Sequence, residues 1–222
     1  MEEDALVARM SDATLAFLEM LTLYVGERLG LYRALADGGP ATASVLASRT
    51  GTHERYVREW LEQQAACGLL EVERPSDDAL ARTYRLPAAH AAVLVDRESL
   101  RFQAARPMSL VAAARRLPAL LEAFRTGRGI AGADDHEGRA AQAELGRAPF
   151  LQLLGASWLA AIPDVHARLS ADPPARVADL GCGGGWSSIP RTTRRRAAIA
   201  CRPPTPTCSS TAKASASRPR VR

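Results

Sequence analysis

The chain has 222 residues, and 47% hydrophobic with 24% charged residues is an ordinary composition for a globular protein. No uncharged apolar stretch approaches the roughly 20 residues of a membrane-spanning helix, and the acidic N-terminus is unlike a secretory signal. We therefore expect a cytoplasmic protein with no membrane segment. The net charge of +5 comes from residues 190–222, which hold nine basic residues and no acid, so the rest of the chain is mildly acidic.

The N-terminal part has the pattern of three helices and a hairpin. Apolar residues recur every three or four positions from Ala5 to about Leu35, as in an amphipathic helix. Two further helices and two strands are predicted at 41–49, 53–66, 69–73 and 83–86. Thr52 is a suitable N-cap for the third helix. Three helices followed by a hairpin predict a winged helix-turn-helix domain over residues 1–95.

The following region, 96–174, is predicted to be a helical linker or cap. Helical patterns are found at 97–106, 110–124 and 150–169, and another lies at 88–95, at the end of the preceding winged-helix domain. Pro107 is expected to interrupt the pattern, and residues 131–146 are too polar to assign. The short run Arg176-Val177-Ala178-Asp179 then predicts the first strand of an α/β domain.

A glycine cluster, Asp179-Leu180-Gly181-Cys182-Gly183-Gly184-Gly185, follows this strand directly. Glycine lets the main chain approach a ligand closely because no Cβ stands between them, so the cluster indicates a nucleotide-cofactor site. A dinucleotide fingerprint would need a glycine at Trp186 or Ser188, and a phosphate-binding P-loop would need Gly-Lys-Ser/Thr. What remains is an acid two residues before three alternating glycines.

This arrangement resembles the first motif of class I S-adenosylmethionine-dependent methyltransferases. The segments 23–32, 50–61 and 181–189 are also similar, in the same order, to bacterial methyltransferases of this class with an N-terminal winged-helix domain. The resemblance covers about residues 12–189. It implies that Gly181, Cys182, Gly183 and Gly185 contact S-adenosylmethionine and that Asp179 supports its amino-acid end, directly or through water. A glycine-rich turn without a ligand is the alternative interpretation.

The resemblance further implies methyl transfer to a small-molecule acceptor. In this family the winged helix is implied to form a homodimer and to cap the substrate site. The sequence agrees, because the helix at 53–66 sets Arg55 and Arg58 against three glutamates, whereas a groove-reading helix presents a positive face. We therefore do not expect nucleic acid as a partner of this domain.

No catalytic or metal-binding residue is assigned from the sequence. The four histidines lack metal-ligand spacing, and the four cysteines match no zinc or redox pattern and are predicted to be free thiols. Asp134-Asp135-His136-Glu137 resembles an acid/base cluster, but a solvated loop is the preferred interpretation. Phe150 and Trp158 are predicted to be core residues that could instead line the pocket.

The sequence departs from the family after the glycine loop. A Rossmann-like domain continues with further βα units and a ribose-binding acid, yet residues 190–222 contain only Ile199 and Val221 as large apolar side chains. We therefore predict a disordered basic tail there, produced by a reading-frame disruption near Ile189, and an incomplete, inactive enzyme. An authentic basic tail that binds nucleic acid or an acidic surface is the alternative.

The predicted fold is mainly α with an α/β remnant. It comprises the winged helix-turn-helix, the helical linker, the start of a truncated Rossmann-like domain at 175–189 and the disordered tail. The second functional hypothesis is a non-enzymatic winged-helix transcriptional regulator or dimerisation module.

Overall fold

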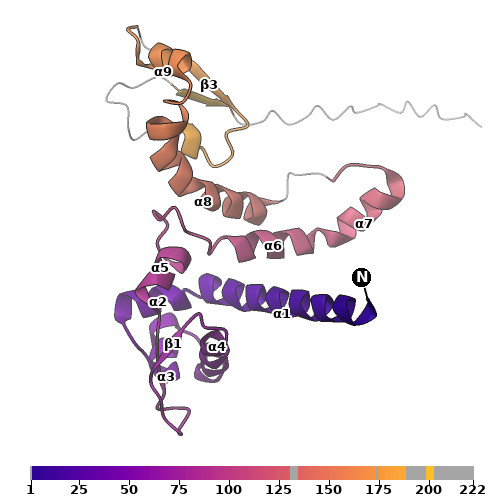
Figure 1. Ribbon diagram of the computed structural model, residues 1–222, viewed down its shortest axis with the longest axis vertical. Helices are drawn as coiled ribbons and strands as arrows, with labels where there is room; N and C mark the ends of the chain where they lie inside the picture. Colours follow the sequence, from indigo (N-terminus) through magenta and orange to yellow (C-terminus); the bar gives the residue numbers. More distant parts are fainter. Residues whose placement is uncertain (1, 131–134, 174, 189–198, 203–222) are drawn as a thin grey trace, which may run out of the picture.

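A computed structural model describes residues 2–130, 135–173, 175–188 and 199–202 of the protein (Figure 1). The described chain is elongated, with the winged-helix domain at one end, a small parallel sheet at the other, and long helices stacked between them (Figure 1). The N-terminal elements are α1 (Glu3–Arg28), α2 (Leu31–Gly38), α3 (Ala43–Thr50), α4 (Glu54–Ala66), β1 (Glu71–Arg74), β2 (Thr83–Arg85) and α5 (Ala88–Leu94). The predicted winged helix-turn-helix layout is thereby confirmed.

Local signals explain where these helices begin and end. The single helix predicted to reach Leu35 is wrong, because Gly30 adopts a left-handed conformation, with φ of 68°, and separates α1 from α2. The N-cap of α4 is His53, whose Nδ1 accepts from the Arg55 amide at 3.3 Å, rather than the predicted Thr52. The Thr52 hydroxyl instead lies 2.8 Å from that of Thr50.

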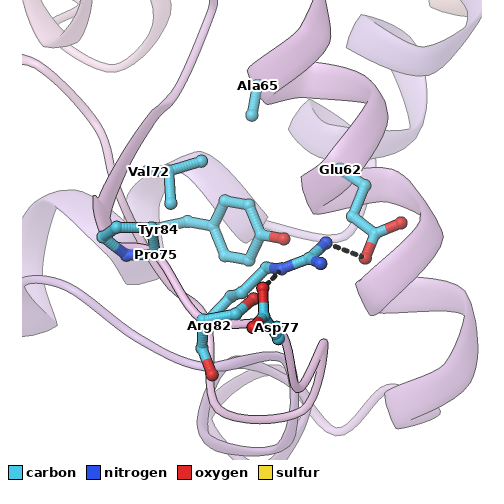
Figure 2. A pocket seen from close by; sticks show the side chains of 8 residues that line it. Glu62, Ala65, Val72, Pro75, Asp77, Arg82 and Tyr84 are labelled. Atoms are coloured by element: carbon cyan, nitrogen blue, oxygen red, sulfur yellow. Dashed lines mark hydrogen bonds and ion pairs between the residues drawn. The ribbon is translucent and has the colours of Figure 1, made fainter.

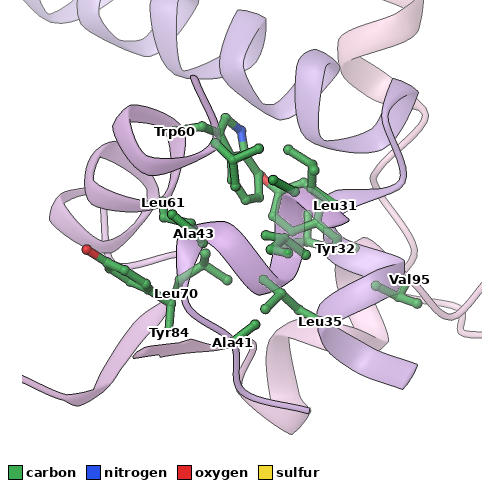
Figure 3. Close-up of a cluster of buried hydrophobic side chains, with 14 of the residues drawn as sticks. Leu31, Tyr32, Leu35, Ala41, Ala43, Trp60, Leu61, Leu70, Tyr84 and Val95 are labelled. Atoms are coloured by element: carbon green, nitrogen blue, oxygen red, sulfur yellow. The ribbon is translucent and has the colours of Figure 1, made fainter. Parts of the chain in front are cut away.

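The core of the winged-helix domain forms where α1, α2, α4 and the hairpin meet (Figure 3). Tyr32 and Trp60 pack edge to face, with ring centroids 5.1 Å apart. Gln64 is fully buried, and it accepts a hydrogen bond from the Tyr32 hydroxyl and donates one of 3.1 Å to Thr22. Each large apolar side chain buried here contributes about 1.5–3 kcal/mol.

The hairpin completes this domain. β1 and β2 pair antiparallel, and Ala41 forms an isolated bridge to Tyr84 through hydrogen bonds of 3.0 and 2.9 Å. This bridge ties the segment before α3 to the wing. The Tyr84 side chain is buried.

The helical region contains α6 (Arg106–Arg115), α7 (Leu117–Thr126) and α8 (His136–Leu153). α6 lies between α1 and α8 and packs against both (Figure 1). Its first turn contains Pro107, which therefore starts the helix instead of interrupting it, because the missing N–H is not needed there. The helix predicted at 97–106 is wrong, since turns precede α6.

A second, smaller core joins α8 to the start of α6 and to the segment just before it. Phe102, Ala104, Ala105 and Ala141 are buried together. Alanines allow the helix axes to approach closely. Within the stretch 131–146, which the sequence left unassigned, residues 136–146 form the first half of α8, and Asp135 caps the helix by accepting from the Gly138 amide at 3.0 Å. Asp134 lies outside the described residues.

The C-terminal part contains the π-helix η1 (Leu154–Trp158), α9 (Pro163–Ser170), β3 (Val177–Leu180), the 3-10 turn η2 (Trp186–Ser188) and β4 (Ile199–Arg202). β3 is the predicted first strand, and it pairs in parallel with β4, with Val177 opposite Ile199 and Leu180 opposite Arg202. Residues 199–202 therefore form a strand where a disordered tail was predicted. The strand forms because the main chain of β3 offers them a hydrogen-bonding edge. The other residues of 190–222 lie outside the described residues.

Across the described ranges, no single helix is both long and apolar enough to cross a membrane. One bent pair, His136–Trp158 with Pro163–Ser170, passes the same length and composition criteria only when its members are taken together.

Candidate functional site

The glycine loop leaves the end of β3 and turns back on itself. Gly181, Gly183 and Gly185 have φ angles of 76°, 55° and 77°, a region that L side chains rarely adopt. The Gly185 amide donates to the Cys182 carbonyl at 2.9 Å and closes the turn. A Cβ placed on any of the three glycines would point into open space. The loop therefore presents bare main chain to its surroundings.

Asp179 fixes the end of this loop to the strand. Both Ser187 and Ser188 donate their hydroxyls to the same carboxylate oxygen, Oδ2, the latter at 3.0 Å. The carboxylate thus bridges the last residues of β3 and η2, which lie on opposite sides of the glycines. Hydrogen bonds to a charged acceptor are stronger than neutral ones, so this bridge helps to fix the shape of the loop.

A cavity of about 590 Å³ separates the glycine loop from α8. This volume lies within the range typical of small-molecule and cofactor sites. The loop supplies one wall, including Asp179, Gly181 and Trp186, and α8 supplies the other, including Arg139, Gln142 and Phe150. The two walls touch at Gly184 and Ala143.

Four of the five predicted cofactor residues line this cavity: Asp179, Gly181, Cys182 and Gly183. Gly185 does not, and its conformation closes the turn behind them. Their role in binding a cofactor stays a prediction. The free thiol predicted at Cys182 is wrong, because this residue is disulfide-bonded, whereas Cys67 is an exposed free thiol.

Sequence patterns missed the wall contributed by α8. Its residues come from a polar stretch without clear apolar periodicity, so the sequence carried no signal that Arg139 or Gln142 faces a cavity. Phe150 lines the cavity and is partly exposed, so the core assignment for this residue is wrong. Trp158 stacks edge to face on it, with centroids 5.7 Å apart, and is exposed on its other side.

The acidic cluster at the start of α8 is structural. Glu137 accepts a 3.1 Å hydrogen bond from the Tyr24 hydroxyl and pairs with Arg115, while Asp135 pairs with Arg116 at 3.0 Å. The hydrogen bond to Tyr24 and then the charge of Glu137 raise the pKa of Arg115. These contacts join α1, α6 and α8, so the segment is not the solvated loop that the sequence predicted.

A second hollow, of about 650 Å³, lies between α4 and the wing (Figure 2). Arg82 crosses it, pairing with Glu62 at 3.3 Å and donating to the Ser76 carbonyl at 2.7 Å. Burial raises the pKa of the Tyr84 phenol beside it. This hollow is far from the glycine loop in the fold (Figure 1), and two of its lining residues, Arg82 and Glu62, already form an ion pair. Within the described parts of the chain, no group of His, Cys, Asp or Glu could hold a metal ion.

The fold and the site together define a winged-helix protein with a cavity between a glycine loop and α8, at the end of the first strand of a small parallel sheet. Residues 16–96 match the model of the Rv2258c-like winged HTH domain. A search of curated protein sequences found no match to the chain.

Solved structures of methyltransferases share the fold. The mitomycin 7-O-methyltransferase MmcR is 20% identical, with a TM-score of 0.54 over 83% of this chain and 64% of its own. Human N-acetylserotonin methyltransferase in complex with S-adenosylmethionine is 16% identical, with a TM-score of 0.56 over 91% of this chain and 66% of its own. The dimethyltransferase RosA from Streptomyces davawensis is 20% identical, with a TM-score of 0.51 over 82% and 54%. This chain therefore spans less than two thirds of the length of each of these proteins.

Proposed function

We propose that the chain binds S-adenosylmethionine between the glycine loop and α8, as a member of the small-molecule methyltransferases with an N-terminal winged helix. The observation that carries the proposal is the glycine loop itself, which offers bare main chain to a cavity at the end of the first Rossmann-like strand. Proteins of the same fold support it, since one of them was solved with S-adenosylmethionine bound.

The residues of the cavity suit this cofactor. Gly181 and Gly183 leave room for a ligand where side chains would otherwise project, and Asp179 brings a carboxylate to the amino-acid end. Phe150 and Trp186 add aromatic surface, against which an adenosine or methionine chain can pack. When bound, S-adenosylmethionine supplies an electrophilic methyl group on a sulfonium.

The protein's own part in such a reaction is to bind and orient, because holding two reactants in line provides much of the acceleration of a displacement. The acceptor in this proposal is a small molecule. None of the described residues is assigned as a catalytic base. Binding is therefore the activity to measure first, and an incomplete, inactive enzyme stays a prediction.

We propose that the chain forms a homodimer through apolar side chains of α1, in the winged-helix domain, and of α7, in the helical region, and that the winged helix does not bind nucleic acid. The basic residues of α4 are compensated, since Arg58 lies 4.0 Å from Glu54 and 3.5 Å from Glu59. Large apolar side chains are instead exposed along α1 and α7: Leu6, Val7, Met10, Leu15, Phe17, Leu18, Leu117, Leu120, Leu121 and Phe124. Such a surface favours association with a second copy. A cytoplasmic location remains the expectation.

Isothermal titration calorimetry of the whole chain with S-adenosylmethionine and S-adenosylhomocysteine tests the proposal. We expect dissociation constants below about 1 mM. Gly181→Val is the matched variant, because it adds a side chain where φ is 76° and where the loop faces the cavity, and it should abolish the heat of binding. Absence of binding by the wild type would leave the winged-helix module as the favoured function.

A further inference from the structure

Arg147 on α8 contacts two parts of the protein that are far apart in the sequence. On one side its guanidinium pairs with Glu98 at 2.5 Å and donates to the Arg97 carbonyl at 3.2 Å. On the other side the guanidinium carbon lies 5.1 Å from the centroid of the Trp186 ring, within cation–π distance. One side chain thus touches both the segment after α5 and the end of the glycine loop.

The segment around Glu98 is itself fixed to the winged-helix domain. Arg33 of α2 donates to the Val95 carbonyl at 2.6 Å. Arg97 pairs with Glu27 of α1 at 3.3 Å and with Glu144 of α8 at 3.4 Å. The segment that Arg147 contacts is therefore held by α1 and α2. When the winged-helix domain changes position, this segment moves with it.

Trp186 is the first residue after the glycine cluster, and it lines the cavity. Its indole Nε1 is shielded from solvent and has no hydrogen-bond partner among the described residues. A tryptophan is usually oriented by a hydrogen bond from this atom when it is buried. Here that restraint is missing, so packing and the stacked guanidinium of Arg147 determine where the ring lies.

We propose that Arg147 is a positioning residue. It holds the Trp186 ring, and with it the glycine loop, in a position that depends on where the segment 97–98 lies. The part of this proposal that concerns ligand affinity rests on the proposed function. Because Arg147 contacts both the segment 97–98 and the Trp186 ring, binding of a ligand to the loop and the placement of the winged-helix domain influence each other. Arg147 acts through Trp186 and does not itself line the cavity.

Two substitutions separate the contacts of Arg147. Arg147→Met removes the charge, and Arg147→Lys keeps an ion pair with Glu98 but loses the planar group over the indole. We measure acrylamide quenching of Trp186, as the difference between each protein and its Trp186→Phe counterpart, and the dissociation constant of S-adenosylhomocysteine. Both variants should raise the quenching of Trp186 and weaken binding by about threefold or more, as expected for loss of a cation–π contact.

A double-mutant cycle distinguishes positioning from general stability. In the Trp186→Phe background, Arg147→Lys should have less effect on affinity than in the wild type, because its target ring has changed. Arg125→Met, which removes an exposed pair with Glu122 on α7, is the control and should change neither readout. Quenching of Trp186 that is equal in wild type and both Arg147 variants, or additive effects on affinity, would overturn the proposal. If the wild type binds no S-adenosylhomocysteine, the proposed function fails and the quenching alone decides the role of Arg147.

Discussion

A Cβ on Gly184 would lie 2.5 Å from the Cβ of Ala143, so the glycine loop and α8 are in direct contact at this pair. Neither residue could be larger without moving the loop away from the helix. Since the cavity lies between these two elements, the contact determines how far its walls are apart. The pair offers a steric test of the site that does not alter any polar group.

We predict that Gly184→Ala weakens binding of S-adenosylhomocysteine at least tenfold and that adding Ala143→Gly restores most of it. The added methyl displaces the loop, and the second substitution removes the atom it meets. Gly183→Ala is the contrast. Its strain arises from a φ of 55° and not from crowding, so Ala143→Gly should not rescue it. Calorimetry of the four variants checks this, and rescue of both glycine variants would contradict it.

The carboxylate of Asp179 provides a second test. Asp179→Ala removes the acceptor of both serine hydroxyls, so η2 should separate from β3, and affinity for S-adenosylhomocysteine should fall at least tenfold. Ser188→Ala removes one of the two bonds and should cost about 1–2 kcal/mol of binding or less. Asp12→Asn, on the exposed part of α1, is the control. An unchanged affinity in Asp179→Ala would show that this residue does not support the ligand.

Close packing around α1 leads to a stability prediction. A Cβ on Gly26 would lie 2.5 Å from the Tyr32 ring and 2.6 Å from the Trp60 ring. Gly26→Ala should therefore lower the free energy of unfolding by about 1–3 kcal/mol, although alanine favours helix. Gly38→Ala meets only the flexible guanidinium of Arg49 and should be nearly neutral. Urea denaturation of both variants measures the difference, and equal midpoints would be inconsistent with the packing described.

The buried phenol of Tyr32 predicts a dependence on alkaline pH. Burial, followed by the charges of Glu19 and Glu27, raises the pKa of Tyr32 well above its ordinary value of 10.0. Above pH 10 the unfolded chain releases this proton while the folded chain keeps it. Stability is therefore fully present below pH 10 and falls as the pH rises further, by up to about 1.4 kcal/mol per pH unit for one proton.

Denaturation between pH 9 and pH 11.5 measures this slope. Tyr32→Phe should be less stable at neutral pH, because Gln64 loses a partner, yet its stability should depend less on pH. Tyr84 contributes in the same direction in both proteins, since its pKa is raised as well. A stability that is constant over this range would contradict the assignment.

Self-association should depend on the apolar face of α7. Phe124 is 84% exposed there, and we expect Phe124→Glu to shift the protein from dimer to monomer in sedimentation velocity. Tyr56→Glu is the matched control, because this aromatic residue is 75% exposed but belongs to α4 and not to α1 or α7. A monomeric wild type, or equal effects of both variants, would exclude this face.

The sequence by itself determined the elements whose signals are local. The winged-helix layout followed from apolar periodicity and turn residues. The strand and glycine loop followed from Val177, Asp179 and the three alternating glycines, because glycine allows backbone conformations that other residues rarely adopt. Only the tertiary structure decided what faces the loop. The wall formed by Arg139, Gln142 and Phe150, the contact of Gly184 with Ala143 and the link through Arg147 join segments about 30 residues apart or more. Such contacts depend on how α8 packs between α6 and η2, and helix packing of this kind leaves no periodic trace in a stretch rich in alanine and charged residues.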